Sequence, residues 1–238
     1  MNSACWGVVV AAGRGERLGG DRAKALFELG GTALVMHAVR ALRDGGCAGI
    51  VVAAPAALIP AVAGLFGESC GTEATLAPGP VVVVAGGSSR QESVAAALEA
   101  VPDNVRWVLV HDAARPLVPV HVVTAVRIRL AAGAPAVVPV LPVVDTIKCV
   151  DPAGLIIATV DRSRMRFAQT PQGFERDLLV RALDESARRG DEVTDDAAAV
   201  AALGVAVQTV PGDERGLKIT TPADLILAEA LLAAQSDR

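Results

Sequence analysis

The sequence predicts an α/β fold built on a mostly parallel sheet with helices on both faces, and three observations support it. Short Val-rich runs bounded by Gly or Pro alternate with longer Ala-, Leu- and Arg-rich stretches of helical period. The short runs are apolar throughout, as in strands that are covered on both faces. Helices that alternate with such strands favour right-handed crossovers, which join parallel strands.

Apolar runs predict the buried strands Gly7–Ala12, Gly49–Ala54, Val81–Ala85, Trp107–His111 and Ala136–Val140. The stretches of helical period predict helices at Thr32–Arg43, Pro55–Phe66, Ser88–Val101 and Pro119–Ala132. In a Rossmann-like sheet of this kind, ligands bind beyond the carboxyl ends of the strands. The loops that follow the strands are therefore the candidate sites.

A β-hairpin interrupts this alternation. Val143–Val150 and Leu155–Val160 flank the tetrapeptide Asp151-Pro152-Ala153-Gly154, whose Asp, Pro and Gly occupy the preferred positions of a type I turn. Because an isolated two-stranded hairpin is only marginally stable in water, it should dock on something. It either packs on its own domain or forms a protruding arm, at about residues 142–162, that embraces a second subunit.

The remaining chain predicts helices at Arg176–Arg189 and Asp195–Leu203, a strand at Val205–Val210, and a last helix from Pro222. Thr221 is suited to cap that helix, since Pro222 then takes the first helical position. The sequence shows no internal repeat or linker. Residues 1–238 are therefore expected to form one domain with an arm.

Composition excludes several classes of partner. The chain has no Tyr, four Phe and a formal charge of −4, which argues against nucleic acid as a ligand. The apolar run Trp6–Ala12 is too short for a signal sequence or a membrane span. The four cysteines lack zinc spacing and are expected to be reduced, buried thiols. We expect a cytoplasmic protein with no membrane contact.

The loop after the first strand is the strongest candidate for a nucleotide site. It begins with Ala11, Ala12, Gly13 and Gly15 and carries the cations Arg14, Arg17, Arg22 and Lys24. Leu18 replaces the glycine of a dinucleotide fingerprint, and the Walker A pattern is absent. Glycines allow close approach of the backbone, and cations offset the charge of a triphosphate that undergoes displacement. The alternative is a flexible surface loop with solvated arginines.

Asp112 and Arg115 follow a second predicted strand. A carboxylate at this position faces the ligand edge of the sheet and suits Mg²⁺, which prefers one or two carboxylates together with substrate phosphates. Arg115 is able to bind a phosphate with two hydrogen bonds. The alternative for Asp112 is a turn cap. His111 is given no role.

Two weaker signals remain. Gly86, Gly87, Ser88 and Ser93 follow a strand and open a helix, so their amides and hydroxyls could bind a base edge, although an ordinary helix start looks the same. Lys218 is a single cation in an otherwise apolar, strand-like stretch, and such a lysine is usually solvated.

Together, the motifs resemble the 2-C-methyl-D-erythritol 4-phosphate cytidylyltransferases of the non-mevalonate isoprenoid pathway. The resemblance covers about Val8 to Ala228 and rests on A-A-G-x-G-x-R, G-G-x-x-R-x-x-S-V, V-H-D-A-A-R-P, D-T-I-K, T-V-D-R, Q-T-P-Q, V-T-D-D and L-K-I-T-x-P-x-D. The family usually has Pro-Lys-Gln where this chain has Ala23-Lys24-Ala25, and Gly-Gly-Asp where it has Gly86-Gly87-Ser88.

The resemblance implies a homodimeric nucleotidyltransferase that uses CTP, Mg²⁺ and a polyol phosphate. Arg17, Lys24 and Lys218 would act on the CTP phosphates, and the stretch from Gly86 to Ser88 together with Ser93 would bind cytidine. Asp112 would lie beside Mg²⁺. Arg115 would hold the polyol phosphate together with Thr146 and Arg162 from the partner subunit's arm.

The phosphate of the substrate is already an anion, so its attack on the α-phosphorus of CTP needs no side-chain base. Positive charge is needed instead, to bring two anions together.

The alternatives are a ribitol 5-phosphate cytidylyltransferase, which would share these motifs, and a catalytically silent CTP-binding regulator. A nicotinamide-dependent oxidoreductase is disfavoured by Leu18.

Overall fold

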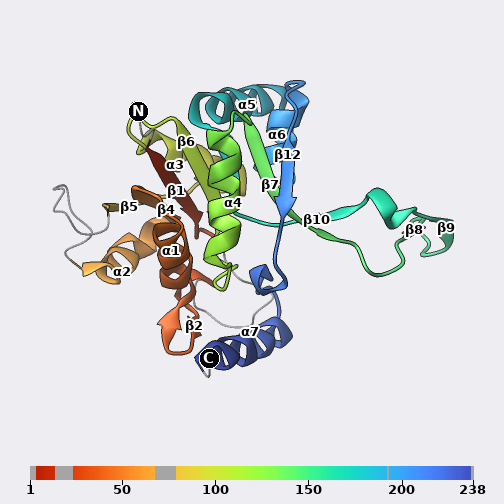
Figure 1. Ribbon diagram of the computed structural model, residues 1–238, viewed down its shortest axis with the longest axis horizontal. Coiled ribbons are helices and arrows are strands. Elements are labelled where there is room, and N and C mark those ends of the chain that lie inside the picture. The colour runs from red at the N-terminus through yellow and green to blue at the C-terminus, as the bar shows by residue number, and fades with distance from the viewer. Residues whose placement is uncertain (1–3, 14–23, 68–78, 192, 237–238) are drawn as a thin grey trace.

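The computed structural model describes residues 4–13, 24–67, 79–191 and 193–236, and its centre is an eight-stranded sheet (Figure 1). The strand order is β10-β7-β11-β6-β1-β4-β5, and β12 also pairs with β7. The parallel strands are β1 (Cys5–Val10), β4 (Gly49–Ala54), β5 (Val81–Ala85), β6 (Trp107–Asp112), β7 (Ala136–Pro142) and β12 (Gln208–Pro211). The antiparallel strands are β10 (Arg166–Ala168) and β11 (Gln172–Glu175).

Helices cover both faces of this sheet. One face packs against α1 (Leu34–Asp44), α2 (Ile59–Gly64) and α4 (Val120–Ala131). The other packs against α3 (Arg90–Glu99), α5 (Arg176–Arg189) and α6 (Asp196–Ala202). The continuous apolar strands make this possible: in β4, Ile50 and Val52 belong to the first core and Val51 to the second. The predicted fold class is confirmed.

Smaller elements complete the domain. They are the 3-10 helices η2 (Lys24–Leu26), η3 (Ala56–Leu58), η5 (Arg162–Arg164) and η6 (Glu214–Gly216), and the short strands β2 (Glu28–Leu29) and β3 (Thr32–Ala33). The C-terminal helix α7 (Pro222–Ser236) packs near β2 in a third apolar cluster that includes Leu29 and Ala228. Its predicted cap is present, because the Asp224 N–H donates to Thr221 Oγ1 at 3.3 Å.

The structure differs from the sequence prediction at several boundaries. The predicted helix Pro55–Phe66 is divided into η3 and α2, because Pro60 has no N–H and fits only the first turn of a helix. Strands β10 and β11 were not predicted; they lie on either side of Pro171 and contain none of the β-branched residues that mark strands.

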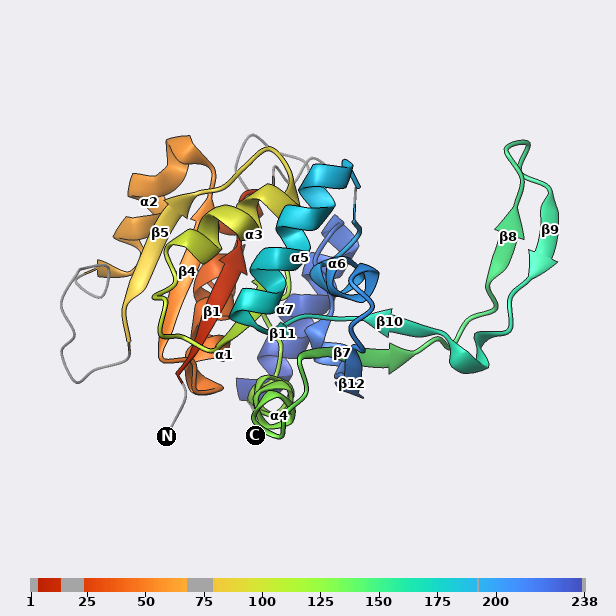
Figure 2. The same cartoon turned by 90° about the horizontal axis from the view of Figure 1, so that it is seen from above.

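The predicted hairpin is formed by β8 (Lys148–Val150) and β9 (Ile156–Thr159), and it extends away from the sheet (Figure 2). At its turn, the Gly154 N–H donates to the Asp151 carbonyl at 3.0 Å, and Gly154 has a φ of +83°. All residues of β8 and β9 are exposed. The hairpin therefore does not pack on its own domain, and we call residues 142–162 the arm.

The prediction of buried thiols is correct for Cys5 and Cys47 but wrong for Cys149. Cys149 lies in β8, which is exposed because the arm projects from the domain. Cys70 lies outside the described residues. No helix in the described ranges is both long and apolar enough to cross a membrane.

Candidate active site

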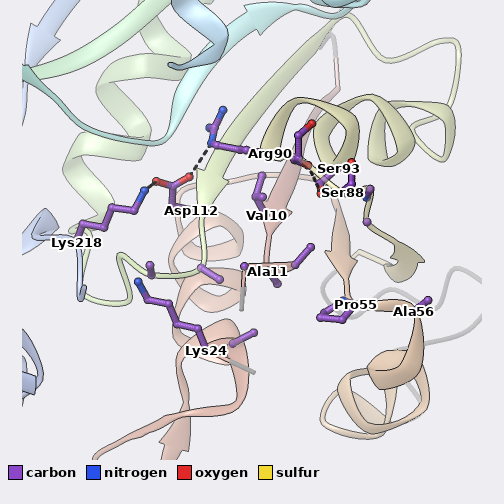
Figure 3. A pocket seen from close by; sticks show the side chains of 18 of the residues that line it. Val10, Ala11, Lys24, Pro55, Ala56, Ser88, Arg90, Ser93, Asp112 and Lys218 are labelled. Carbon is purple, nitrogen blue, oxygen red and sulfur yellow. Dashed lines mark hydrogen bonds and ion pairs between the residues drawn. The ribbon is translucent and has the colours of Figure 1, made fainter. Parts of the chain in front are cut away.

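A cavity of about 1000 Å³ lies beyond the carboxyl ends of β1 and β6 (Figure 3). Its position follows from the strand order. The chain passes from β1 to β4 on one side and returns to β6 on the other side of β1. Loops leave two neighbouring strands in opposite directions at such a reversal, which opens a crevice for ligands. The cavity is the candidate active site.

Most of the predicted nucleotide-binding residues line this cavity. They are Ala11, Ala12, Gly13, Lys24, Gly86, Gly87, Ser88, Ser93, Asp112 and Lys218. Gly15 and Arg17 lie outside the described residues. Figure 3 shows the Lys24 side chain extending toward the end of the cavity where Lys218 meets Asp112.

The loop between β5 and α3 is held in place by its own side chains. Ser89 caps α3 by accepting from the Glu92 N–H at 3.1 Å. Ser93 Oγ accepts from the Gly87 N–H at 3.1 Å, and Glu92 accepts from both the N–H and the hydroxyl of Ser88 at 2.7 Å. A methyl group on Gly86 would lie 2.6 Å from Ala12 Cβ, so only glycine allows the two loops to meet. The loop is preorganised beside the cavity.

Asp112 is the centre of an ion-pair cluster at the end of β6. Lys218 Nζ lies 2.8 Å from its Oδ2, and Arg90 Nε lies 3.2 Å from its Oδ1 (Figure 3). Arg115 Nε is more distant, at 3.9 Å from Oδ2. Burial alone would raise the pKa of Asp112, but the charges of Arg90 and Lys218 outweigh it and hold that pKa well below its usual value. Asp112 is therefore a carboxylate at neutral pH.

Arg90 also pairs with a second carboxylate. Its Nη2 lies 2.8 Å from Asp196 Oδ2, and the Asp196 side chain is only 2% exposed. Arg90 and Asp196 belong to the motifs G-G-x-x-R and V-T-D-D, but neither was predicted to have a role. The pairing joins segments that are far apart in the chain, so no local pattern could have predicted it.

Lys218 reaches Asp112 from an extended segment rather than from the strand that its apolar neighbours suggest. The Ile219 N–H donates to the Ala114 carbonyl at 2.8 Å, which attaches this segment to the loop after β6. Gln169 supports the preceding loop, because its Nε2 donates to the Asp213 carbonyl and its Oε1 accepts from the Asp213 N–H. The position of Lys218 therefore depends on contacts from two other segments.

Arg115 does not line the cavity. Its Nη1 donates to the Gly216 carbonyl at 2.7 Å and its Nη2 to the Ala168 carbonyl at 3.3 Å. Burial lowers the pKa of Arg115 below its usual value, and Asp112 opposes that shift. In this structure Arg115 joins the loop after β6 to η6 and β10 through these two bonds.

His111, which was given no role from the sequence, is fully buried. Its Nε2 lies 3.1 Å from the Arg115 carbonyl and its Nδ1 lies 2.8 Å from Thr170 Oγ1. A carbonyl only accepts, so Nε2 bears the proton and Nδ1 accepts from the Thr170 hydroxyl. Burial lowers the pKa of His111 to about 4, and the ring is neutral at pH 7.

Thr146 and Arg162 lie on the arm and are exposed. The arm projects away from the sheet (Figure 2), and neither residue lines the cavity of its own chain. If they hold a substrate, it is one bound in another copy of the protein.

The described residues contain no group of three or more His, Cys, Asp or Glu side chains suited to a metal. Among the described residues that line the cavity, Asp112 is the only carboxylate. This fits an Mg²⁺ ion that arrives with nucleotide phosphates, because such an ion needs only one or two protein carboxylates.

The comparisons agree with this geometry. The family model described as "2-C-methyl-D-erythritol 4-phosphate cytidylyltransferase" matches residues 5–234. Relatives with that name include proteins of Frankia casuarinae (51% identical, covering 95% of this chain and 80% of the relative) and Saccharopolyspora erythraea (51%, 95% and 98%). A crystal structure of the Thermus thermophilus enzyme is 37% identical, covers 98% of this chain and all of that one, and has a TM-score of 0.75. The chain belongs to the 2-C-methyl-D-erythritol 4-phosphate cytidylyltransferase family.

Proposed function

We propose that the chain joins CTP and 2-C-methyl-D-erythritol 4-phosphate to give 4-diphosphocytidyl-2-C-methyl-D-erythritol and pyrophosphate. A phosphate oxygen of the polyol substrate attacks the α-phosphorus of CTP. The bond from that phosphorus to the oxygen bridging the α- and β-phosphates breaks, and pyrophosphate leaves. The observation that supports this most directly is the convergence of Lys24, Asp112 and Lys218 on one cavity in a member of this family.

The cations supply the main chemistry. Two anions react, so the transition state gathers negative charge at one phosphorus, and fixed positive groups stabilise it. Lys218 and Lys24 line the cavity, and we assign them to the α-phosphate and the neighbouring phosphates. Arg17 is expected to join them, although it lies outside the described residues.

We assign the cytidine to the loop between β5 and α3. Gly86, Gly87 and Ser88 present backbone groups to the cavity, and Ser93 supports them from the first turn of α3. Ser88 replaces the aspartate usual in the family, but its hydroxyl and N–H both bind Glu92. Glu92 therefore places a carboxylate beside Ser88, where the family usually has the aspartate itself.

We propose Mg²⁺ as the cofactor, with Asp112 as its protein ligand. Bound with the nucleotide, the ion would withdraw negative charge from the phosphates. Asp112 Oδ2 is paired with Lys218 in this structure, so a metal ligand role requires Lys218 to turn toward the phosphates.

We also propose a homodimer in which each arm completes the partner's site. The arm and its base expose many apolar side chains, including Val144, Val150, Leu155, Ile156, Ile157, Met165 and Phe167. Exposed apolar patches of this kind are typical of interfaces. Thr146 and Arg162 would then reach the polyol phosphate from the partner subunit. A cytoplasmic location stays a prediction.

A pyrophosphate-release assay tests the activity. The purified protein is mixed with Mg²⁺, each of CTP, UTP and ATP, and either 2-C-methyl-D-erythritol 4-phosphate or ribitol 5-phosphate. We expect release only with CTP and the methylerythritol substrate. Faster release with ribitol 5-phosphate would favour the ribitol enzyme, and CTP binding without release would favour a silent regulator.

A further inference from the structure

We propose that Arg90 and Asp196 act as a positioning pair that fixes the orientation of the Asp112 carboxylate at the edge of the cavity. This inference rests on the proposed function, because it concerns the same cavity. It gives a role in turnover to Asp196, a residue that does not line the cavity.

Four charged side chains alternate in sign across this site. Asp196 Oδ2 lies 2.8 Å from Arg90 Nη2, Arg90 Nε lies 3.2 Å from Asp112 Oδ1, and Asp112 Oδ2 lies 2.8 Å from Lys218 Nζ. The guanidinium group is planar and rigid, so contacts with two carboxylates fix its plane. The Asp112 carboxylate then has one oxygen held by Arg90, and its other oxygen faces Lys218.

Asp196 is anchored independently of the cavity. It is the first residue of α6, and the preceding residue, Asp195, caps that helix by accepting from the Ala198 N–H at 2.9 Å. Gln172 donates to Asp195 at 2.8 Å and accepts from the Ala197 N–H at 3.1 Å. The start of α6 is thus attached to β11, which lies beside β6 in the sheet.

The side chains of this cluster differ in how far they are buried. The exposed fraction of the side chain is 2% for Asp196, 27% for Arg90 and 42% for Lys218. Asp196 is the most buried of these side chains and does not line the cavity. It can therefore influence a bound substrate only through its contact with Arg90. Two buried carboxylates without Arg90 would also repel one another, which would turn Asp112 away from its present position.

A lysine could not replace Arg90. Its ammonium group is a point charge, whereas the two contacts of Arg90 come from different nitrogens of one fork. Arg90→Lys would keep the positive charge in the cavity but would lose the contact with either Asp112 or Asp196. Asp112 would then have more than one orientation.

The test is a double-mutant cycle on the full chain, with turnover, the KM for CTP and Tm measured for each variant. The variants are Asp196→Asn, Arg90→Lys and the two combined. Asp177→Asn on α5 is the control, because it removes a carboxylate that is paired with Arg176 and whose side chain is 89% exposed. We expect Asp196→Asn to lower kcat about tenfold, a loss in the range measured for residues of one charge network. The KM for CTP should change by less than about threefold.

The control should retain wild-type kcat, and Asp196→Asn should cause no further loss in the Arg90→Lys background. The inference is overturned if Asp196→Asn matches the control, or if the two losses multiply in the combined variant. If Asp196→Asn does not fold, wild-type kcat in Arg90→Lys also overturns it. Failure of the proposed function is distinct, because the wild-type protein would then release no pyrophosphate.

Discussion

The ammonium nitrogen of Lys218 lies 2.8 Å from Oδ2 of Asp112, although the two residues come from distant parts of the chain. The last residue of β6 supplies the carboxylate, and the segment between η6 and α7 supplies the cation. The Lys218 side chain is 42% exposed, whereas that of Asp112 is 10% exposed. The lysine can therefore move from the carboxylate to a phosphate while the carboxylate stays fixed.

Lys218→Gln should lower kcat by about 10²–10³, which is the loss seen when one preorganised donor to a developing charge is removed. Arg90 still pairs with Asp112 in this variant, so Tm should fall by only a few degrees. Pyrophosphate release and thermal unfolding check the two expectations. Arg188→Gln on α5 removes an exposed cation that does not line the cavity and should leave kcat unchanged. Near-wild-type turnover of Lys218→Gln would exclude Lys218 from the reaction.

The sequence was sufficient to predict the sheet and the position of Asp112 at the end of a strand, because buried strands are recognised from local apolar runs. The boundaries of Gly49–Ala54, Val81–Ala85 and Arg176–Arg189 agree with the structure residue for residue. These elements are the ones whose apolar pattern is interrupted by Gly, Pro or polar residues at both ends.

Long-range contacts could not be predicted in this way. Lys218 lies in an apolar stretch that resembles a strand, but the segment is held by a hydrogen bond to Ala114 and no strand forms. The pairing of Arg90 with Asp196 depends on how α3 and α6 pack on the same face of the sheet. Arg115 was expected to bind a phosphate, and only the structure shows its two backbone carbonyl partners.

His111 should make the stability of the protein depend on pH between about 6.5 and 4. Burial lowers its pKa to about 4, whereas an unfolded histidine titrates near 6.5. The unfolded state therefore binds the extra proton first as the pH falls, and stability decreases through this window. The free energy of unfolding of His111→Gln should differ between pH 7 and pH 5 by about 2 kcal/mol less than that of the wild type. Urea unfolding at both pH values measures this, and an unchanged difference would contradict a neutral, buried His111.

Gly86→Ala should weaken CTP binding and destabilise the fold. The added methyl group would lie 2.6 Å from Ala12 Cβ and 2.9 Å from Ser93 Oγ, so the two loops beside the cavity must separate. Overpacking of this kind costs about 1–3 kcal/mol. We expect a lower Tm and a higher KM for CTP, measured by thermal unfolding and by initial rates. Gly64→Ala in α2 is the matched control, since no described atom lies within 4 Å of its added methyl group. An unchanged KM for Gly86→Ala would show that the cytidine does not bind against this loop.

If each arm completes the site of the partner subunit, as proposed, two inactive variants should restore activity when they are combined in one dimer. Lys218→Gln disables the cavity of its own chain, and Arg162→Ala disables the arm that would enter the partner's cavity. In a mixed dimer, the Arg162→Ala chain keeps an intact cavity and receives the intact arm of the Lys218→Gln chain. Random pairing of equal amounts makes half of the dimers mixed, with one intact site of two, so roughly a quarter of wild-type turnover should return. Co-expression of the two variants, followed by the pyrophosphate assay, measures this recovery, and each variant alone is the baseline. If each arm serves the cavity of its own chain, every chain in the mixture is defective and no activity returns.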